Sequence, residues 1–339
     1  MRPLTLRRVL WTCAALGALL LVVVVLALKL GAVPISVTDL VMSLGRLAIG
    51  KSDQLPSEYR LIVFDLRLPR ILLGILVGAG LSVAGAGFQA LLRNPLADPY
   101  VLGVSSGAAL GAILSLVFAP HLPLILPVAA FLGAGAAIAA VFLLGRRDGQ
   151  LDSATLLLAG IITASFLSAV IWFLMTTLNP RDVRGMAFWL MGDLSVPLPP
   201  SLRWIFLGGL LAAIAAIYTT AGDLNLLLAG EREAVHLGVD VTRVKLVVYL
   251  AASMLTGLAV AVSGAIGYVG LLIPHIMRML FGSDYRMLIP TCAIGGAIAI
   301  VLADMLARTV VAPMELPVGA MTAMAGAPVF IYLLRRTAG

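Results

Sequence analysis

Long apolar runs without a charged residue constrain this chain more than any other feature of its sequence. A helix that crosses a bilayer needs about 20 consecutive apolar residues, and runs of this kind recur along the whole chain. Hydrophobic residues make up 61% of the sequence and charged residues 12%, whereas a soluble domain has roughly 25% charged residues. A soluble core of this size cannot enclose so much apolar surface. The sequence therefore predicts an integral membrane protein.

Ten transmembrane helices are expected, in one all-α polytopic domain over residues 1–339. Two of the apolar runs are too long for a single helix. Prolines between residues 120 and 127 divide the first, and glycines between residues 264 and 270 divide the second. The predicted spans are residues 9–28, 71–92, two within 99–145, 153–178, 204–222, two within 246–277, 287–303 and 316–334.

The N-terminal segment is interpreted as the first span, not as a cleaved signal peptide. Its apolar run from Val9 to Leu28 is longer than the 7–15 residues of a signal-peptide core. An even number of spans places both termini on the same side. The segments on that side hold slightly more lysines and arginines than those on the other, which favours cytoplasmic termini under the positive-inside rule.

Similar small residues in the second and seventh spans indicate an internal duplication. A shift of 179 residues aligns Gly78 and Pro95 with Gly257 and Pro274. The second and seventh spans are separated by an odd number in the order of the helices, so they cross the membrane in opposite directions. The inverted repeats of transporters have this arrangement. A chance match between glycine- and alanine-rich helices is the alternative.

Residues 45–52 match the phosphate-loop pattern G-x-x-x-x-G-K-[ST] in every position. That loop normally joins a buried strand to a helix, but residues 53–56 here are Asp-Gln-Leu-Pro. The match also lies on the side opposite the termini, away from cytoplasmic ATP. We therefore expect no nucleotide site at Lys51.

Residues 223–240 form the most distinctive loop on the side of the termini. Residues 224–229 and 231–237 are each predicted to form a short helix, with a hinge at Gly230 and a stop at Gly238. A rigid helix pair suits docking into the groove of a partner protein. An ordinary solvated loop is the alternative.

Eight short motifs follow one another from the second span to the tenth. They lie at residues 67–70 (RLPR), 89–99 (QALLRNPLADP), 102–108 (LGVSSGA), 230–234 (GEREA), 273–278 (IPHIMR), 303–308 (ADMLAR), 315–319 (ELPVG) and 326–330 (GAPVF). In this order they resemble the FecCD-type permeases of bacterial type II ABC importers, which carry iron–siderophores, haem or cobalamin. The resemblance covers nearly the whole chain.

The resemblance implies an inverted-repeat permease of the bacterial inner membrane, surrounded by lipid and translocating a large metal chelate. An iron–siderophore is favoured, and haem or cobalamin is possible. The implied assembly is a homodimer with two cytoplasmic ATPase subunits and a periplasmic or extracellular substrate-binding protein. ATP and Mg²⁺ would bind to the ATPase. This chain itself is expected to hold no cofactor or metal and to be no enzyme.

Three arginines are candidates for docking of the binding protein. Arg67 and Arg70 begin the second span, and Arg308 follows the ninth. From the residues alone, snorkelling of each guanidinium to the lipid headgroups is the alternative. In the family the matching arginines face carboxylates of the binding protein, and paired Arg–carboxylate bonds are directional. Asp304, one turn before Arg308, is interpreted as its structural partner.

The resemblance also implies a surface that couples to the ATPase and a cytoplasmic gate. The coupling residues are Gly230, Glu231, Arg232, Glu233, Ala234, Leu237 and Gly238. The gate residues are Asn94 and Leu96 after the second span, with Ser153 and Ala154 at the start of the fifth. Some relatives have two hydroxyl residues at the last two positions, so the polarity of the gate differs here.

Other functions call for patterns that the predicted spans lack. A secondary transporter driven by an ion gradient would show paired carboxylates in mid-span. An intramembrane enzyme would show a convergent set such as Ser and His, but the three histidines are widely separated. The two cysteines give neither a disulfide framework nor metal-site spacing. The net charge of +7 comes from basic residues scattered between apolar runs, so no nucleic-acid partner is expected.

Overall fold

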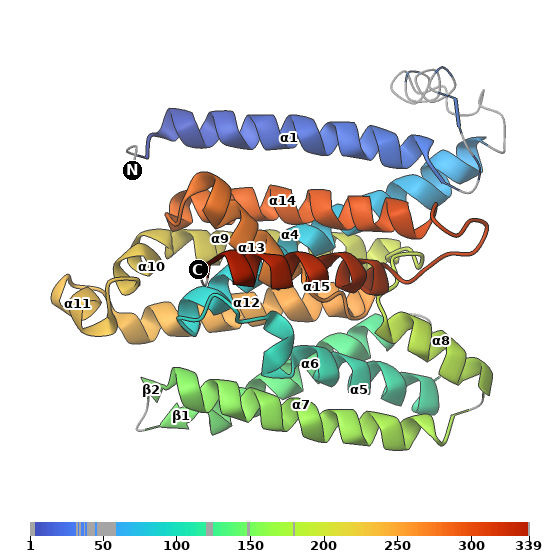
Figure 1. Ribbon diagram of the computed structural model, residues 1–339. Coiled ribbons are helices and arrows are strands. Elements are labelled where there is room, and N and C mark those ends of the chain that lie inside the picture. The colour runs from blue at the N-terminus through green and yellow to red at the C-terminus, as the bar shows by residue number, and fades with distance from the viewer. Residues whose placement is uncertain are drawn as a thin grey trace.

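The protein is a bundle of long helices that run roughly parallel or antiparallel to one another (Figure 1). The computed structural model describes residues 4–31, 59–119, 125–147, 150–178 and 180–337, with single residues at 33, 35, 36, 38 and 45. Except for Gly45, the phosphate-loop match at residues 45–52 lies outside the described residues.

The elements follow in chain order. They are α1 (Leu6–Lys29), η2 (Arg60–Arg67), α4 (Leu68–Leu91), η3 (Pro99–Leu102), α5 (Val104–Phe118), α6 (Ile125–Leu144), β1 (Arg146–Arg147), β2 (Gln150–Leu151), α7 (Ser153–Met175), α8 (Pro180–Leu190), α9 (Pro200–Thr219), α10 (Ala221–Leu227), α11 (Glu231–His236), α12 (Val241–Ser263), α13 (Val269–Phe281), α14 (Tyr285–Ala307) and α15 (Val318–Thr337). The strands β1 and β2 form a short antiparallel pair.

Each of the ten predicted spans corresponds to a helix. Within the described residues, seven helices are long and apolar enough to cross a membrane, with η2 and α4 forming one continuous stretch. The other three spans are the shorter apolar helices α5, α13 and α15. The prediction of a helical, polytopic membrane protein is therefore confirmed.

The sequence-based boundaries differ from the structure in several places. The second span begins earlier, because η2 extends α4 back to Arg60. The break expected between residues 264 and 270 falls at residues 264–268, where α12 ends and α13 begins. Helix α8 was not predicted, because Arg181, Asp182 and Arg184 in its first half leave no charge-free run long enough for a membrane span.

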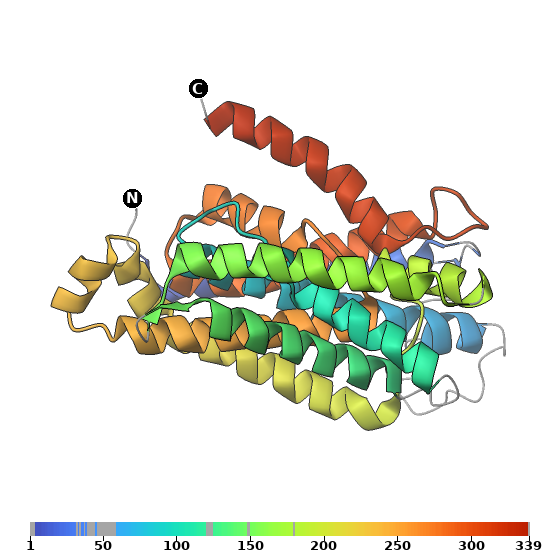
Figure 2. The ribbon, with the colours of Figure 1, turned by 90° about the horizontal axis from the view of Figure 1, so that it is seen from below.

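The bundle has two distinct ends (Figure 1). Both termini lie at one end together with α10, α11 and the β1–β2 pair, and we call this the terminal end. Helix α8 lies at the other, where α1 ends and α4 begins. We call this the arginine end, since Arg67, Arg70 and Arg308 lie there. Helix α15 diverges from the bundle as it approaches the terminal end (Figure 2).

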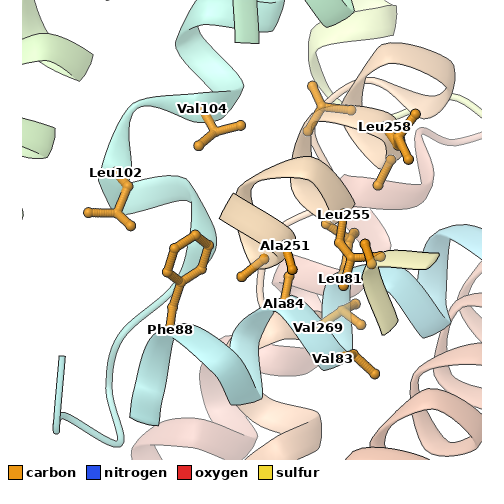
Figure 3. Close-up of a cluster of buried hydrophobic side chains, with 14 of the residues drawn as sticks. Leu81, Val83, Ala84, Phe88, Leu102, Val104, Ala251, Leu255, Leu258 and Val269 are labelled. Carbon is orange, nitrogen blue, oxygen red and sulfur yellow. The ribbon is translucent and has the colours of Figure 1, made fainter. Parts of the chain in front are cut away.

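Helix α4 is central to the core. Every residue from Leu81 to Leu91 is buried, and Figure 3 shows Leu81 and Ala84 beside Ala251 and Leu255 of α12. The end of α4 at Leu91 adjoins the start of α12 at Lys245. The two helices therefore run in opposite directions, as the predicted inverted repeat requires. Duplication itself stays a prediction.

Two glycine contacts bring α4 close to its neighbours. Gly78 lies against the backbone of Gly296 in α14, and Gly85 lies against the backbone of Gly270 in α13. A Cβ atom at either position of α4 would overlap the facing backbone. Small residues allow this close packing where lipid supplies no hydrophobic force between helices.

Candidate docking and coupling surfaces

One buried carboxylate joins two helices at the arginine end. Arg70 Nε, at the start of α4, donates to Asp304 Oδ1 at 2.7 Å. Arg308 Nε donates to Asp304 Oδ2 at 2.9 Å. Asp304 is 1% exposed, so its charge is balanced entirely inside the protein. The expected pairing of Asp304 with Arg308 is present, and Arg70 is a second partner.

Glu315 extends this network to the surface. Its Oε2 atom lies 2.7 Å from Arg70 Nη1, and its side chain is 44% exposed. Glu315 precedes α15, and its contact with Arg70 was not predicted from the sequence. One feature of the sequence could have indicated this contact. Glu315 lies next to the tenth predicted span at the end of the bundle where Arg70 also lies, and the two side chains have opposite charges.

Arg67 is bound in a different way. Its guanidinium donates to the backbone carbonyls of Leu28, Lys29 and Val33. The first two belong to the end of α1, where carbonyl groups lack helical donors. Arg67 is 6% exposed and Arg308 5% exposed, so neither extends into water as snorkelling would require.

The three arginines surround a cavity of about 280 Å³ whose polar lining also includes Glu315 and Ser195. Arg67, Arg70 and Arg308 carry three positive charges, while Asp304 and Glu315 carry two negative charges. One positive charge therefore remains unbalanced within this group. Such a surface attracts a carboxylate of a partner, although docking at these three arginines stays a prediction.

At the terminal end, α10 and α11 form a short helix pair, and α10 begins at Ala221, earlier than the sequence predicted. Gly230 precedes α11 with φ 137°, and Gly238 follows it with φ 84°. Only glycine adopts such angles without strain. The hinge and the stop therefore lie where the backbone requires glycine.

Most of α11 is accessible to a partner. Glu231 and Glu233 occupy its first turn, where the helix dipole favours negative charge. Arg232 and Glu233 are exposed, Val235 and Leu237 are 58% and 63% exposed, and Ala234 is buried. Exposed apolar side chains among charges are typical of a surface that another protein covers.

Two contacts that the sequence did not predict attach this helix pair to the bundle. Glu231 Oε1 pairs with Lys245 Nζ of α12 at 2.7 Å. Asn225 of α10 bonds to Asp284 and to the backbone of Tyr285 at the start of α14. Burial raises the pKa of Asp284, but hydrogen bonds from Arg286 and Asn225 outweigh it, and the pKa lies below its usual range.

The candidate gate residues lie close together at the terminal end. Ser153 Oγ donates to the carbonyl of Leu91 at 3.0 Å, which places the start of α7 against the end of α4. Asn94 Oδ1 accepts from the backbone N–H of Leu96 at 2.9 Å and shapes the turn that follows. Leu96 and Ala154 are exposed. Closure of a pathway by these residues stays a prediction.

Motifs that are far apart in sequence meet inside the bundle. Buried Gln89 of α4 accepts a hydrogen bond from Arg278 Nη2 and donates to the carbonyl of Leu271. Tyr100 Oη accepts from the N–H of Ile266 at 2.8 Å, in the break between α12 and α13. Neither pairing was predicted, because sequence order carries no signal of which polar residues meet.

In the described part of the chain, no three His, Cys, Asp or Glu side chains are placed to hold a metal ion. His275, in α13, has a buried Nε2 atom without a hydrogen-bond partner among the described groups. The described residues therefore show no metal centre.

Several proteins of known class are similar to this chain. The ABC transporter permease YvrB of Bacillus subtilis (strain 168) is 47% identical over 82% of this chain and 80% of its own length. The cobalamin import permease BtuC of Halobacterium salinarum is 41% identical over 83% and 75%. The hemin transport permease HmuU of Yersinia pestis is 42% identical over 81% and 83%.

The fold has a solved counterpart. An inward-facing conformation of a metal-chelate type ABC transporter superposes with a TM-score of 0.83 and 31% identity, covering 96% of this chain and 99% of that chain. The helical membrane fold is thus the ABC importer permease fold. The model of the FecCD transport family matches residues 19–336, so the chain is a member of the FecCD transport family.

Proposed function

We propose that this chain is the membrane-spanning subunit of an ATP-driven importer that carries a large metal chelate across the bacterial inner membrane. The observation that carries the proposal is that chemically different groups lie at opposite ends of one family-typical helix bundle. The arginine end has an excess positive charge, and the terminal end presents exposed α11. A permease that works between two partners needs one surface for each.

In this proposal the terminal end is cytoplasmic. Two ATPase subunits contact α11 in a homodimer of this chain, and ATP and Mg²⁺ are bound there and not by this chain. Exposed Val235 and Leu237 would be covered by the ATPase. The arginine end then faces the substrate-binding protein. The chain acts as a translocation subunit and catalyses no covalent step.

We infer a large, metal-containing cargo from the relatives named above, one of which is a cobalamin permease and another a hemin permease. Among such cargoes we favour an iron–siderophore complex, the commonest cargo of the family. A pathway between two copies of the chain would be lined by apolar helices. The exposed apolar side chains on α15, such as Met324 and Tyr332, fit such a lining or the contact between the copies.

The test is uptake by proteoliposomes that contain this chain with the ATPase and binding protein encoded beside it. Ferric siderophores, haem and cobalamin are offered separately, with ATP inside or outside the vesicles. We expect uptake of one chelate class only when ATP is on the side of α11. Uptake without ATP but with a proton or sodium gradient would instead show that the chain is a secondary transporter driven by that gradient.

A further inference from the structure

Asn225 fixes α10 to the first turn of α14 through both ends of its amide group. Its Nδ2 atom donates to Asp284 Oδ1 at 2.8 Å, and its Oδ1 atom accepts from the backbone N–H of Tyr285 at 2.8 Å. An amide side chain donates and accepts at once, which an aspartate or a leucine at this position cannot do. We call this pair of bonds the Asn225–Asp284 contact.

Helix α11 is attached less firmly than α10. Helix α10 buries Ala221, Leu224 and Leu227, whereas α11 buries only Ala234 among its described residues. Between them lies Gly230, whose φ of 137° marks a change of direction. Helix α10 is therefore part of the packed bundle, and α11 is the part that a partner reaches.

Helix α14 connects the Asn225–Asp284 contact to the opposite end of the bundle. Its 23 residues correspond to a length of about 34 Å at 1.5 Å per residue. Its last turn carries Asp304, which binds Arg70 and Arg308. In its middle, Gly296 lies against the backbone of Gly78 in α4. A displacement of its first turn is thus carried along one packed helix.

Helix α12 is the other route from this helix pair, since Lys245 pairs with Glu231. However, α12 ends at Ser263 and contains none of the three arginines. In the described part of the chain, α14 is bonded to α10 and carries Asp304 of the arginine network in its last turn, whereas α12 carries no residue of that network. This difference favours α14 as the connection between the two surfaces.

We propose that the Asn225–Asp284 contact transmits displacement of the α10–α11 segment to α14, and through α14 to the Asp304 network at the arginine end. Asn225 and Asp284 are then positioning residues for transport. The inference rests on the proposed function, in which the ATPase contacts α11 and the binding protein contacts the arginine end. A physical connection of this kind predicts that binding at one end changes the affinity for the partner at the other end, in both directions.

Two variants and a control separate this role from simple packing. Asn225→Asp replaces the donor with a carboxylate and sets it against Asp284. Asp284→Asn keeps an acceptor for Asn225 and keeps a good N-cap for α14. Gly222→Asp is the matched control, because it adds the same charge to α10 where the space around it is open.

The measurements are co-purification with the ATPase, basal ATP hydrolysis, and the stimulation of hydrolysis by the binding protein. For Asn225→Asp we expect association and basal hydrolysis within about twofold of the unmodified chain, because Asn225 lies in α10 and not in α11, which the ATPase contacts in the proposed function. We expect its stimulation by the binding protein to fall about tenfold, within the usual range of coupling between sites. Asp284→Asn and Gly222→Asp should keep most of the stimulation.

Normal stimulation in Asn225→Asp would overturn the inference while leaving the proposed function intact. If Asn225→Asp does not insert into the membrane, Asn225→Ala removes both hydrogen bonds without adding a charge. Asn225→Ala must then also lower the stimulation of hydrolysis by the binding protein, or the inference is wrong. Failure of the unmodified chain to associate with any ATPase would overturn the proposed function and this inference together.

Discussion

Arg70 Nε lies 2.7 Å from Asp304 Oδ1, although the two residues are 234 positions apart in the chain. This bond joins the start of α4 to the end of α14. Arg308 binds the second oxygen of the same carboxylate. The three charges hold two central helices in register at the arginine end, where both helices leave the apolar core.

Replacing Asp304 with Asn should destabilise the fold more than any other single change in this network. The variant leaves the guanidiniums of Arg70 and Arg308 facing each other without a buried counter-charge. Breaking a buried ion pair in this way typically costs about 3–5 kcal/mol. The measurement is thermal unfolding of the purified chain in detergent. Glu315→Gln is the control, and an equal loss in both variants would contradict the central role of Asp304.

The spans were predictable because a bilayer demands a property that the sequence shows directly, a long run without charges. Gly230 was predictable as a hinge for a similar reason, since a positive φ selects glycine. The bond between Gln89 and Arg278 was not predictable, because it depends on how α4 and α13 pack across 189 positions of sequence. The same holds for Asp304 as the shared partner of two arginines.

Removing the hydroxyl of Tyr100 should loosen the break between α12 and α13. The hydroxyl accepts the N–H of Ile266, and in Tyr100→Phe that buried donor is left without a partner. Such a loss costs about 1–3 kcal/mol. We expect a lower unfolding temperature than for Tyr218→Phe, since Tyr218 is 46% exposed. Equal unfolding temperatures would show that water replaces the lost acceptor.

The carboxylate of Asp284 should give the fold a dependence on acidic pH. Its folded-state pKa is lowered, so its contribution is fully present above the unfolded value of about 3.9. It is lost as the pH falls through the lower folded-state value. Unfolding temperature measured from neutral to acidic pH should therefore fall less steeply for Asp284→Asn. Superimposable curves would contradict this.

Reversing the charge of Glu233 should weaken the association with the ATPase. Glu233 is exposed in the first turn of α11, where an arginine opposes the helix dipole and changes the surface that a partner meets. The measurement is co-purification of Glu233→Arg with the ATPase. Membrane insertion and binding of the substrate-binding protein serve as controls and should not change. Normal co-purification with normal transport would remove α11 from the coupling surface.

Glu315 should compete with the binding protein for Arg70. Replacing the arginines themselves is not a clean test, because Arg67 and Arg308 are buried and hold α1 and α14 in place. Glu315 is half exposed and bonds only one nitrogen of Arg70, and a surface pair of this kind contributes about 0–1 kcal/mol. Glu315→Gln should therefore fold normally. Its neutral amide oxygen should hold Arg70 Nη1 more weakly than the carboxylate does, so that a carboxylate of the partner can replace it.

The variant also raises the positive charge at the arginine end by one, so the binding protein should associate faster. We expect an increase of a few-fold, about two- to fivefold at low salt, that shrinks as salt is added, because charges at the rim of an interface act mainly on the association rate. The matched control is Glu233→Gln, which changes the net charge equally but at the terminal end. Binding kinetics on the reconstituted chain at two salt concentrations distinguish the outcomes. Slower association of Glu315→Gln would mean that Glu315 orients Arg70 for the partner and does not compete with the partner. Equal association rates of Glu315→Gln and Glu233→Gln would mean that docking does not use Arg70.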